Sequence, residues 1–195
     1  RGETLAKFGQ FCALADFFQE DDWGRWPAAY HHPAAPVVVE FAREHLQSIR
    51  VYQYGQWLLA SQHDQACQEA SRRGLPLTLY QDLAIGASPD GYDTWGHQDL
   101  FALTATIGAP PAAFNPRGQN WGLPPLIPER LRQSGYQIFI DTIKANAPPG
   151  GMLRMDHVMG LFRLFWIPQG AETATGTYVT YPSRELLAIL ALESM

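Results

Sequence analysis

The sequence has 195 residues, a hydrophobic content of 46% and a formal net charge of −5 at neutral pH. This apolar content excludes a disordered chain, and the length is sufficient for one domain with a core. The acidic balance, without a stripe of Lys and Arg, argues against nucleic acid as a partner. No apolar run approaches the roughly 18 residues of a membrane span, so no membrane partner is expected.

The cysteines and the two ends predict a cytoplasmic piece of a longer protein. Cys12 and Cys67 lie far apart without a CxxC spacing, and nothing resembles a signal peptide. We therefore expect free thiols in a reducing cytoplasm. The sequence begins with Arg1 rather than Met and stops inside an apolar helical run, so we expect an excerpt of a longer chain.

Helical patterns dominate the first part of the sequence. Apolar side chains recur at helical spacing over residues 5–19, which predicts an amphipathic helix. Residues 21–36 contain three prolines and indicate a surface loop. Two adjacent histidines in that loop have no acid or thiol at ligand spacing, which favours a solvated loop over a metal site. Residues 37–73 are predicted to form two helices, with Gly74 as the C-cap.

Two segments are predicted to be buried strands, each with an aspartate at its end. Residues 75–85 carry Asp82, and Asp156 follows the apolar run that contains Arg154. The carboxyl ends of parallel barrel strands carry the chemistry of such folds, so both aspartates fit one rim. Strand alternation points Arg154 and Asp156 to the same side, where the cation favours an ionised carboxylate.

These charged residues have two interpretations. An ionised, oriented carboxylate at position 156 can act as a nucleophile, as a base or as the stabiliser of a cation. An Arg-x-Asp pair on one strand face is also often just a structural ion pair. Asp82 can likewise serve only to cap the amides of the segment that follows it.

The remaining elements alternate between turns and helices. Residues 90–95 indicate an acidic, aromatic turn with too few oxygen ligands in series for a calcium site. Residues 128–147 are predicted to be helical, with a proline in the first turn. The apolar residues 158–166 are compatible with a helix, residues 170–182 contain a predicted hairpin, and residues 183–194 form the last predicted helix.

Residues 108–125 form the most irregular stretch. Their five prolines and three glycines exclude a long helix or strand. A long loop inside a compact domain is usually functional. Trp121 stands between Asn120 and Gly122, which leaves its ring room to point outward. The alternative is that Trp121 anchors the loop to the core.

Several segments resemble one known family. The run LRMDHVMG at residues 153–160 resembles the nucleophile motif of the 4-alpha-glucanotransferases, the amylomaltases or disproportionating enzymes of glycoside hydrolase family 77 in the α-amylase clan. LPLTLYQDLAI resembles the family's MPIGLYRDLAVG, and GAPPAAFNPRGQNWGLPP resembles its GAPPxxFxxxGQNWGLPP. VYQYGQWLLASQ is similar to FYxxLQWLA, and TGTYVTYP to GxYVxYP. The matches span nearly all of the chain.

This resemblance implies an α/β fold, part of a (β/α)8 TIM barrel with helical insertions. Residues 1–195 would form an incomplete catalytic barrel domain. Within it, residues 1–73 would be mainly helical, and residues 74–195 would carry barrel strands and the irregular loop at 108–125. The implied reaction is retaining transfer of α-1,4-glucan segments between malto-oligosaccharides, with no cofactor and no metal.

The resemblance also implies roles for individual residues. Asp156 matches the nucleophile that forms a glycosyl-enzyme, and Arg154 would hold it and keep it ionised. Asp82 and His157 would bond hydroxyls of the sugar in the donor site.

The irregular loop matches a loop that flanks the family's sugar cleft and is thought to move as a gate. An indole face stacks on the apolar face of a glucose ring, which is the role that the resemblance implies for Trp121. Gln119, Asn120 and Arg117 would bond sugar hydroxyls, and Phe114 belongs to the same substrate-binding loop.

One part of the family's site is absent from the sequence. The general acid, a Glu in a GEDLG motif, and a stabilising Asp after a His have no match, so the chain carries half of an active site. Three functions stay open: a glucanotransferase, an amylolytic hydrolase of the same clan, or an inert carbohydrate-binding or structural fragment. The GQNWGLPP loop favours the transferase. The 195 residues alone are expected to be inactive and poorly soluble.

Overall fold

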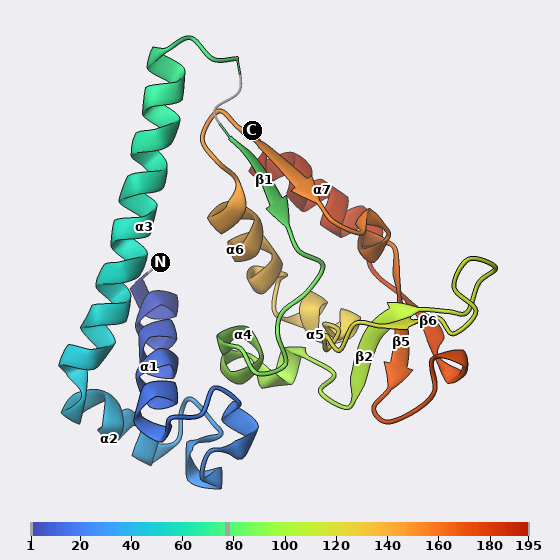
Figure 1. Cartoon of the computed structure of the whole chain (residues 1–195), viewed down its shortest axis with the longest axis horizontal. Helices are drawn as coiled ribbons and strands as arrows, with labels where there is room; N and C mark the ends of the chain where they lie inside the picture. Colours follow the sequence, from blue (N-terminus) through green and yellow to red (C-terminus); the bar gives the residue numbers. More distant parts are fainter. Residues whose placement is uncertain (1, 77–78, 195) are drawn as a thin grey trace. The chain divides into compact units, whose positions relative to one another are not determined.

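The computed structural model describes residues 2–76 and 79–194. The chain divides into two compact units, residues 1–69 with 90–98 and residues 70–89 with 99–195. The first unit is built from helices, and the second combines strands with helices (Figure 1). The predicted mixed α/β class is therefore confirmed, whereas a closed barrel is not formed by the described residues.

The first unit contains the helices that the sequence predicts, together with short 3-10 turns (η). Its elements are α1 (Gly2–Phe18), η1 (Trp23–Arg25), η2 (Ala28–Tyr30), α2 (Pro36–Glu44), most of α3 (Leu46–Arg72) and α4 (Tyr92–Gly96). The two helices expected over residues 37–73 are α2 and α3. The turn expected over residues 90–95 is in part a helix, since α4 begins within it.

The core of the first unit is aromatic. Phe11 of α1 lies against Trp26 and Trp95, with ring centroids 5.4 and 5.6 Å away. The interpretation of residues 21–36 as a surface loop is wrong for its two tryptophans, because Trp23 is only 9% exposed and Trp26 only 3%. The loop folds back on α1 because burying an indole removes a large apolar area from water.

Helices α1 and α3 run side by side (Figure 1) and meet closely at one glycine. A Cβ atom on Gly9 would lie 2.9 Å from the backbone oxygen of Ile49, so any side chain there would push the helices apart. The hydroxyl of Tyr52 on α3 donates to the carboxylate of Asp16 on α1. This hydrogen bond, together with burial and the nearby negative charge of Asp16, raises the pKa of Tyr52 to about 12.

Helix α3 ends at the predicted glycine cap. Gly74 has a φ of +71°. Its N–H donates to the oxygen of Ser71 at 2.9 Å, and the N–H of Leu75 donates to the oxygen of Ala70 at 3.1 Å. This pair of bonds is the Schellman motif, which satisfies the last helical carbonyls. The prediction for Gly74 is confirmed.

The second unit holds a parallel strand pair. Strand β1 (Tyr80–Leu83) pairs with β4 (Met152–Met155), and the two arrows lie side by side in Figure 1. Both strands were predicted from the sequence, although residues 77–78 of the first segment lie outside the described residues. Their predicted burial is wrong: Tyr80 is 62% exposed and Met152 is 54% exposed. Among the described residues the two strands pair only with each other, so they lack the further neighbouring strands that a barrel strand has.

An antiparallel sheet forms the other part of this unit. Its strand order is β3 (Gln119–Asn120), β2 (Ala105–Ala109), β5 (Arg163–Pro168) and β6 (Thr177–Thr180). The hairpin predicted over residues 170–182 is confirmed in part: β6 lies in this range, but its partner strand β5 ends at Pro168, before the range begins.

The helix expected over residues 158–166 is wrong. The short η4 (Val158–Leu161) is followed by strand β5. Strand β5 pairs with β2 on one side and β6 on the other, and Phe165 and Ile167 are buried. A central strand that is buried on both faces carries a continuous apolar run, and periodicity alone does not separate such a run from a buried helix.

Helices α5 (Pro128–Gln133), α6 (Gln137–Asn146) and α7 (Ser183–Glu193) pack on the core of the second unit. The short 3-10 turns η3 (Gln98–Leu100) and η5 (Thr173–Thr175) complete the elements of the described residues. The buried core consists of Ile107, Leu131, Leu161, Leu164, Tyr181 and Leu186. Residues 128–147 are helical as predicted, but Gly135 and Tyr136, both with positive φ, divide them into two helices. None of the helices in the described ranges is long and apolar enough to cross a membrane.

Candidate active site

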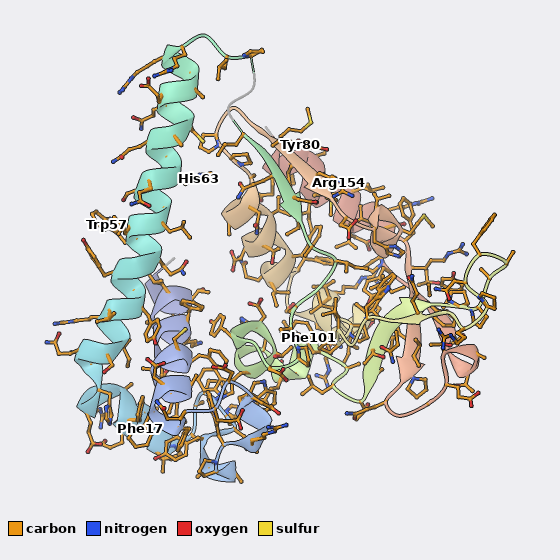
Figure 2. The ribbon with its side chains drawn as sticks, viewed as in Figure 1. Phe17, Trp57, His63, Tyr80, Phe101 and Arg154 are labelled. Atoms are coloured by element: carbon orange, nitrogen blue, oxygen red, sulfur yellow. The ribbon has the colours of Figure 1, made fainter. Side chains whose placement is uncertain are left out.

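Three charged side chains meet on the parallel strand pair. Asp82 on β1 and Arg154 on β4 are register partners, and Nη1 of Arg154 donates to Oδ2 of Asp82. Nη2 of the same guanidinium lies 3.4 Å from Oδ1 of Asp156. Figure 2 labels Arg154 on β4 and Tyr80 on the paired strand β1. One guanidinium therefore bridges two carboxylates that lie far apart in the sequence.

The end of β4 positions Asp156. Its backbone N–H donates to the oxygen of Leu83 at 3.0 Å, which continues the parallel pairing by one residue beyond the strand. Because side chains two residues apart on a strand point the same way, Arg154 and Asp156 share one side, as predicted.

The cluster is open to solvent. The side chains of Arg154, Asp82 and Asp156 are 49%, 57% and 51% exposed. Ion pairs exposed to this degree stabilise a fold by only about 0–1 kcal/mol each. If these ion pairs served only the structure, they would therefore contribute little to the stability of the fold. A role in orienting the carboxylates requires only the contacts that are observed.

His157 occupies an unusual backbone conformation directly after Asp156. Its φ is 47° and its ψ is 57°, which is the left-handed region that costs a residue with a Cβ about 1–2 kcal/mol. The backbone oxygen of His157 accepts a hydrogen bond of 2.8 Å from Gly160, so the turn leads directly into η4. Backbone strain of this kind is concentrated at functional sites.

The irregular loop reaches this turn through Trp121. The rings of Trp121 and His157 meet edge to face, with centroids 5.1 Å apart. Trp121 is half-buried against the core of the second unit, and its Nε1 donates to Oε1 of Gln119 at 3.1 Å. The indole is thus partly anchored, as one interpretation expected, and it contacts the residue that follows Asp156.

The two amide side chains of the loop are engaged within it. Oε1 of Gln119 accepts from Trp121, and Oδ1 of Asn120 accepts from the N–H of Gly122 at 2.9 Å. Gly122 has a φ of +72°, which suits the tight turn at this point. These oxygens shape the loop, and the amide NH₂ groups are the donors left for a ligand.

Phe114 lies apart from the charged cluster. It sits in a tight turn in which Ala112 and Asn115 exchange backbone hydrogen bonds of 2.9 and 3.0 Å. Its side chain is fully exposed. The structure thus joins Asp82, Arg154 and Asp156, while Phe114 stands at the tip of the loop.

One contact of the loop has no counterpart in the sequence analysis. Oγ1 of Thr173 in η5 donates to the backbone oxygen of Arg117. No motif marks a threonine in this hairpin connection, so sequence reasoning offers no signal for it. Within the described residues, no group of three or more His, Cys, Asp or Glu side chains is arranged to hold a metal ion.

The family model described as 4-alpha-glucanotransferase, glycoside hydrolase family 77, matches residues 1–195. The chain belongs to this family, which confirms the resemblance of its motifs.

Individual relatives agree with this assignment. The 4-alpha-glucanotransferase of Mycobacterium tuberculosis is 42% identical over 193 residues, which cover 99% of this chain and 26% of the relative. That of Haemophilus influenzae is 40% identical over 203 residues, covering 100% of this chain and 29% of the relative. The chain thus spans about a quarter of the length of these relatives.

Two solved structures share the fold. The amylomaltase from Corynebacterium glutamicum has a TM-score of 0.82 at 33% identity, over 100% of this chain and 25% of that one. The amylomaltase from Streptococcus agalactiae in complex with acarbose has a TM-score of 0.86, over 98% of this chain and 40% of that one. Its identity is 21%, so it supports the fold alone.

Proposed function

We propose that this chain is one part of a 4-alpha-glucanotransferase that moves α-1,4-glucan segments between malto-oligosaccharides. The observation that carries the proposal is Asp156 at the end of a parallel strand, tied through Arg154 to Asp82 on the neighbouring strand. Because the chain belongs to the 4-alpha-glucanotransferase family, we interpret this carboxylate as the nucleophile of glucan transfer. The short span relative to the relatives supports the view that a longer enzyme completes the site.

In the same proposal, β1 and β4 are neighbouring strands of a (β/α)8 barrel. They are parallel, as barrel strands are, and each carries an aspartate near its carboxyl end. The free thiols Cys12 and Cys67 support a reducing, cytoplasmic location for the enzyme.

Asp156 acts as the nucleophile of a double displacement. A carboxylate oxygen attacks the anomeric carbon, the bond from that carbon to the leaving glucan breaks, and a general acid of the enzyme protonates the leaving oxygen. A hydroxyl of a second glucan then attacks the same carbon, the ester bond to Asp156 breaks, and the hydroxyl proton returns to the acid/base. Two inversions retain the α-configuration.

Arg154 and Asp82 prepare the nucleophile for this step. Nη2 of Arg154 lies beside Asp156, and Asp82 holds the other side of the guanidinium in place. The guanidinium contact at 3.4 Å holds the carboxylate of Asp156 in a fixed orientation for the attack. The exposure of both carboxylates allows a sugar to reach them.

His157 and the loop contribute sugar contacts. The imidazole of His157 and the carboxylate of Asp82 bond hydroxyls of the donor sugar, and the indole of Trp121 provides an apolar face for a glucose ring. Gln119 and Asn120 donate from their amide groups, and Phe114 extends the wall at the loop tip. The strained turn at His157 and its contact with Trp121 support a shared site.

The decisive variant is Asp156→Asn in the whole enzyme that contains this chain. Removal of a covalent nucleophile should lower maltotriose disproportionation by several orders of magnitude while leaving the fold intact. Asp141→Asn, at an exposed carboxylate on α6, is the matched control and should behave as wild type. Asp156→Asn with near-wild-type glucose release would refute the proposal.

Two further measurements separate the alternatives. An α-glucosyl fluoride loses fluoride with little acid assistance, so a glycosyl ester on Asp156 should appear by peptide mass spectrometry and be absent from Asp156→Asn. Products from maltotriose distinguish transfer, which yields glucose and longer oligosaccharides, from hydrolysis, which yields only shorter sugars. Hydrolysis alone would favour an amylolytic hydrolase.

A further inference from the structure

A residue from the β5–β6 connection holds the base of the loop that joins β2 to β3. Thr173 donates through Oγ1 to the backbone oxygen of Arg117. Gly118 follows with a φ of +66°, and a Cβ there would lie 2.7 Å from the oxygen of Ala109 and 3.0 Å from Oγ1 of Thr173. The base of the loop is therefore closely packed, and the threonine hydroxyl closes it.

Beyond this base the loop is a small, internally bonded turn. Ala112 and Asn115 exchange two backbone hydrogen bonds, and the N–H of Gly118 donates to the oxygen of Asn115 at 3.0 Å. Phe114 projects from this turn and is fully exposed. Because the turn is bonded to itself, its direction relative to the sheet is set mainly where it joins the base.

The far end of the loop is fixed separately. Strand β3 pairs with β2 through Asn120 and Gln119, and Trp121 contacts His157. Loss of the bond at Thr173 would therefore free the turn that carries Phe114 but leave Trp121 in place. A substitution at Thr173 can therefore test the role of Phe114 without displacing Trp121.

We propose that Thr173 is a positioning residue that sets the direction of Phe114 by fixing the base of the loop. The assignment of that loop to malto-oligosaccharide binding rests on the proposed function. The hydrogen bond from Thr173 to the backbone oxygen of Arg117, which we call the brace, rests on the structure alone. The hydroxyl acts only through the backbone of Arg117 and touches no reacting atom.

The test uses three variants of the whole enzyme. Thr173→Val removes the hydroxyl and keeps the branched shape, and Thr173→Ser keeps the hydroxyl. Thr175→Val is the matched control, since Oγ1 of Thr175 donates at 2.8 Å to Glu172 within the same connection. All three should retain the melting temperature of the wild type within a few degrees.

The first readout is limited proteolysis by chymotrypsin, which cleaves after aromatic residues. Loss of one hydrogen bond shifts a local opening equilibrium by about fivefold, so cleavage after Phe114 should be about fivefold faster in Thr173→Val. Thr173→Ser and Thr175→Val should be cleaved at the wild-type rate. Equal rates for Thr173→Val and Thr175→Val would overturn the brace, as would a serine variant cleaved as fast as the valine variant.

The second readout is the kinetics of malto-oligosaccharide transfer. Thr173→Val should raise KM about fivefold with kcat within about twofold, because a misdirected Phe114 weakens substrate binding rather than chemistry. Faster proteolysis with unchanged KM would overturn the positioning role, and so would a large fall in melting temperature. Absence of transfer in the wild type would refute the proposed function, while the proteolysis result would still decide on the brace.

Discussion

Replacing Arg154 by lysine separates the charge of this residue from its geometry. Lysine keeps the cation, but its single ammonium cannot present two nitrogens at fixed spacing to two different carboxylates. In the structure, one nitrogen of Arg154 is bonded to Asp82 and the other lies 3.4 Å from Asp156. Arg154→Lys should therefore keep one of these contacts and lose the bridge.

The expected effects on stability and on catalysis differ in size. The side chains are about half exposed, so loss of one ion pair should cost only about 0–1 kcal/mol of unfolding free energy. A hydrogen bond to a charged group contributes about 1.5–3 kcal/mol, and the 3.4 Å contact to Asp156 is long, so we take the lower half of this range. This is about 1.5–2.2 kcal/mol, and at about 1.4 kcal/mol per tenfold change the rate should fall by about 10- to 40-fold.

The assay is maltotriose disproportionation by the whole enzyme, measured beside urea unfolding. Arg132→Lys is the matched control, because Arg132 forms an exposed ion pair with Glu185 in the same unit. In a double-mutant cycle with Asp82→Asn, the combined loss should be smaller than the sum of the single losses, since both changes break one bridge. Activity of Arg154→Lys within twofold of wild type, or strictly additive losses, would refute the reasoning.

Three further predictions concern the loop and the first unit. Trp121→Ala should raise KM for malto-oligosaccharides. Because the ring is half-buried, the loss of unfolding free energy should be smaller than the roughly 3–5 kcal/mol that truncation of a fully buried tryptophan costs. A large fall in melting temperature with unchanged KM would assign Trp121 to the core. Gly118→Ala should destabilise the enzyme more than Gly122→Ala in urea unfolding. Both glycines have positive φ, but only at Gly118 would the new Cβ meet backbone, 2.7 Å from the oxygen of Ala109. Equal losses of unfolding free energy in the two variants would contradict the close packing at the base of the loop. Burial raises the pKa of Asp93, so its contribution to stability is present below the pKa of an unfolded aspartate and is lost as pH rises through the folded pKa. Asp93→Asn should therefore be more stable than wild type near pH 7, with a smaller difference near pH 3.

Local patterns in the sequence were sufficient for much of the fold. Helices α1 and α7 and the Gly74 cap follow from apolar spacing and from the left-handed preference of glycine, which act within a few residues. The shared side of Arg154 and Asp156 follows from strand alternation in the same way. The motif at residues 153–160, together with matching segments along nearly all of the chain, also indicated the family, since each motif lies in one continuous stretch.

The predictions from sequence are wrong where segments that are distant in the chain determine whether a residue is buried. The apolar run of β5 looked helical because its two pairing partners, β2 and β6, are invisible in a local pattern. Trp23 and Trp26 looked like loop residues, and they are buried because the loop folds onto α1. In both cases burial comes from contacts that are remote in the sequence, and these override the local signal.

By itself, the sequence therefore determined which charged residues lie at the ends of the two parallel strands and on which side of a strand they stand. Only the tertiary structure decided their partners. The guanidinium of Arg154 divides between Asp82 and Asp156 because β1 and β4 are neighbours in register. The contacts of Trp121 with His157 and of Thr173 with Arg117 likewise join segments that meet only in the folded chain. The physical reason is that backbone periodicity sets the direction of a side chain, whereas strand pairing and packing between distant segments set what it meets.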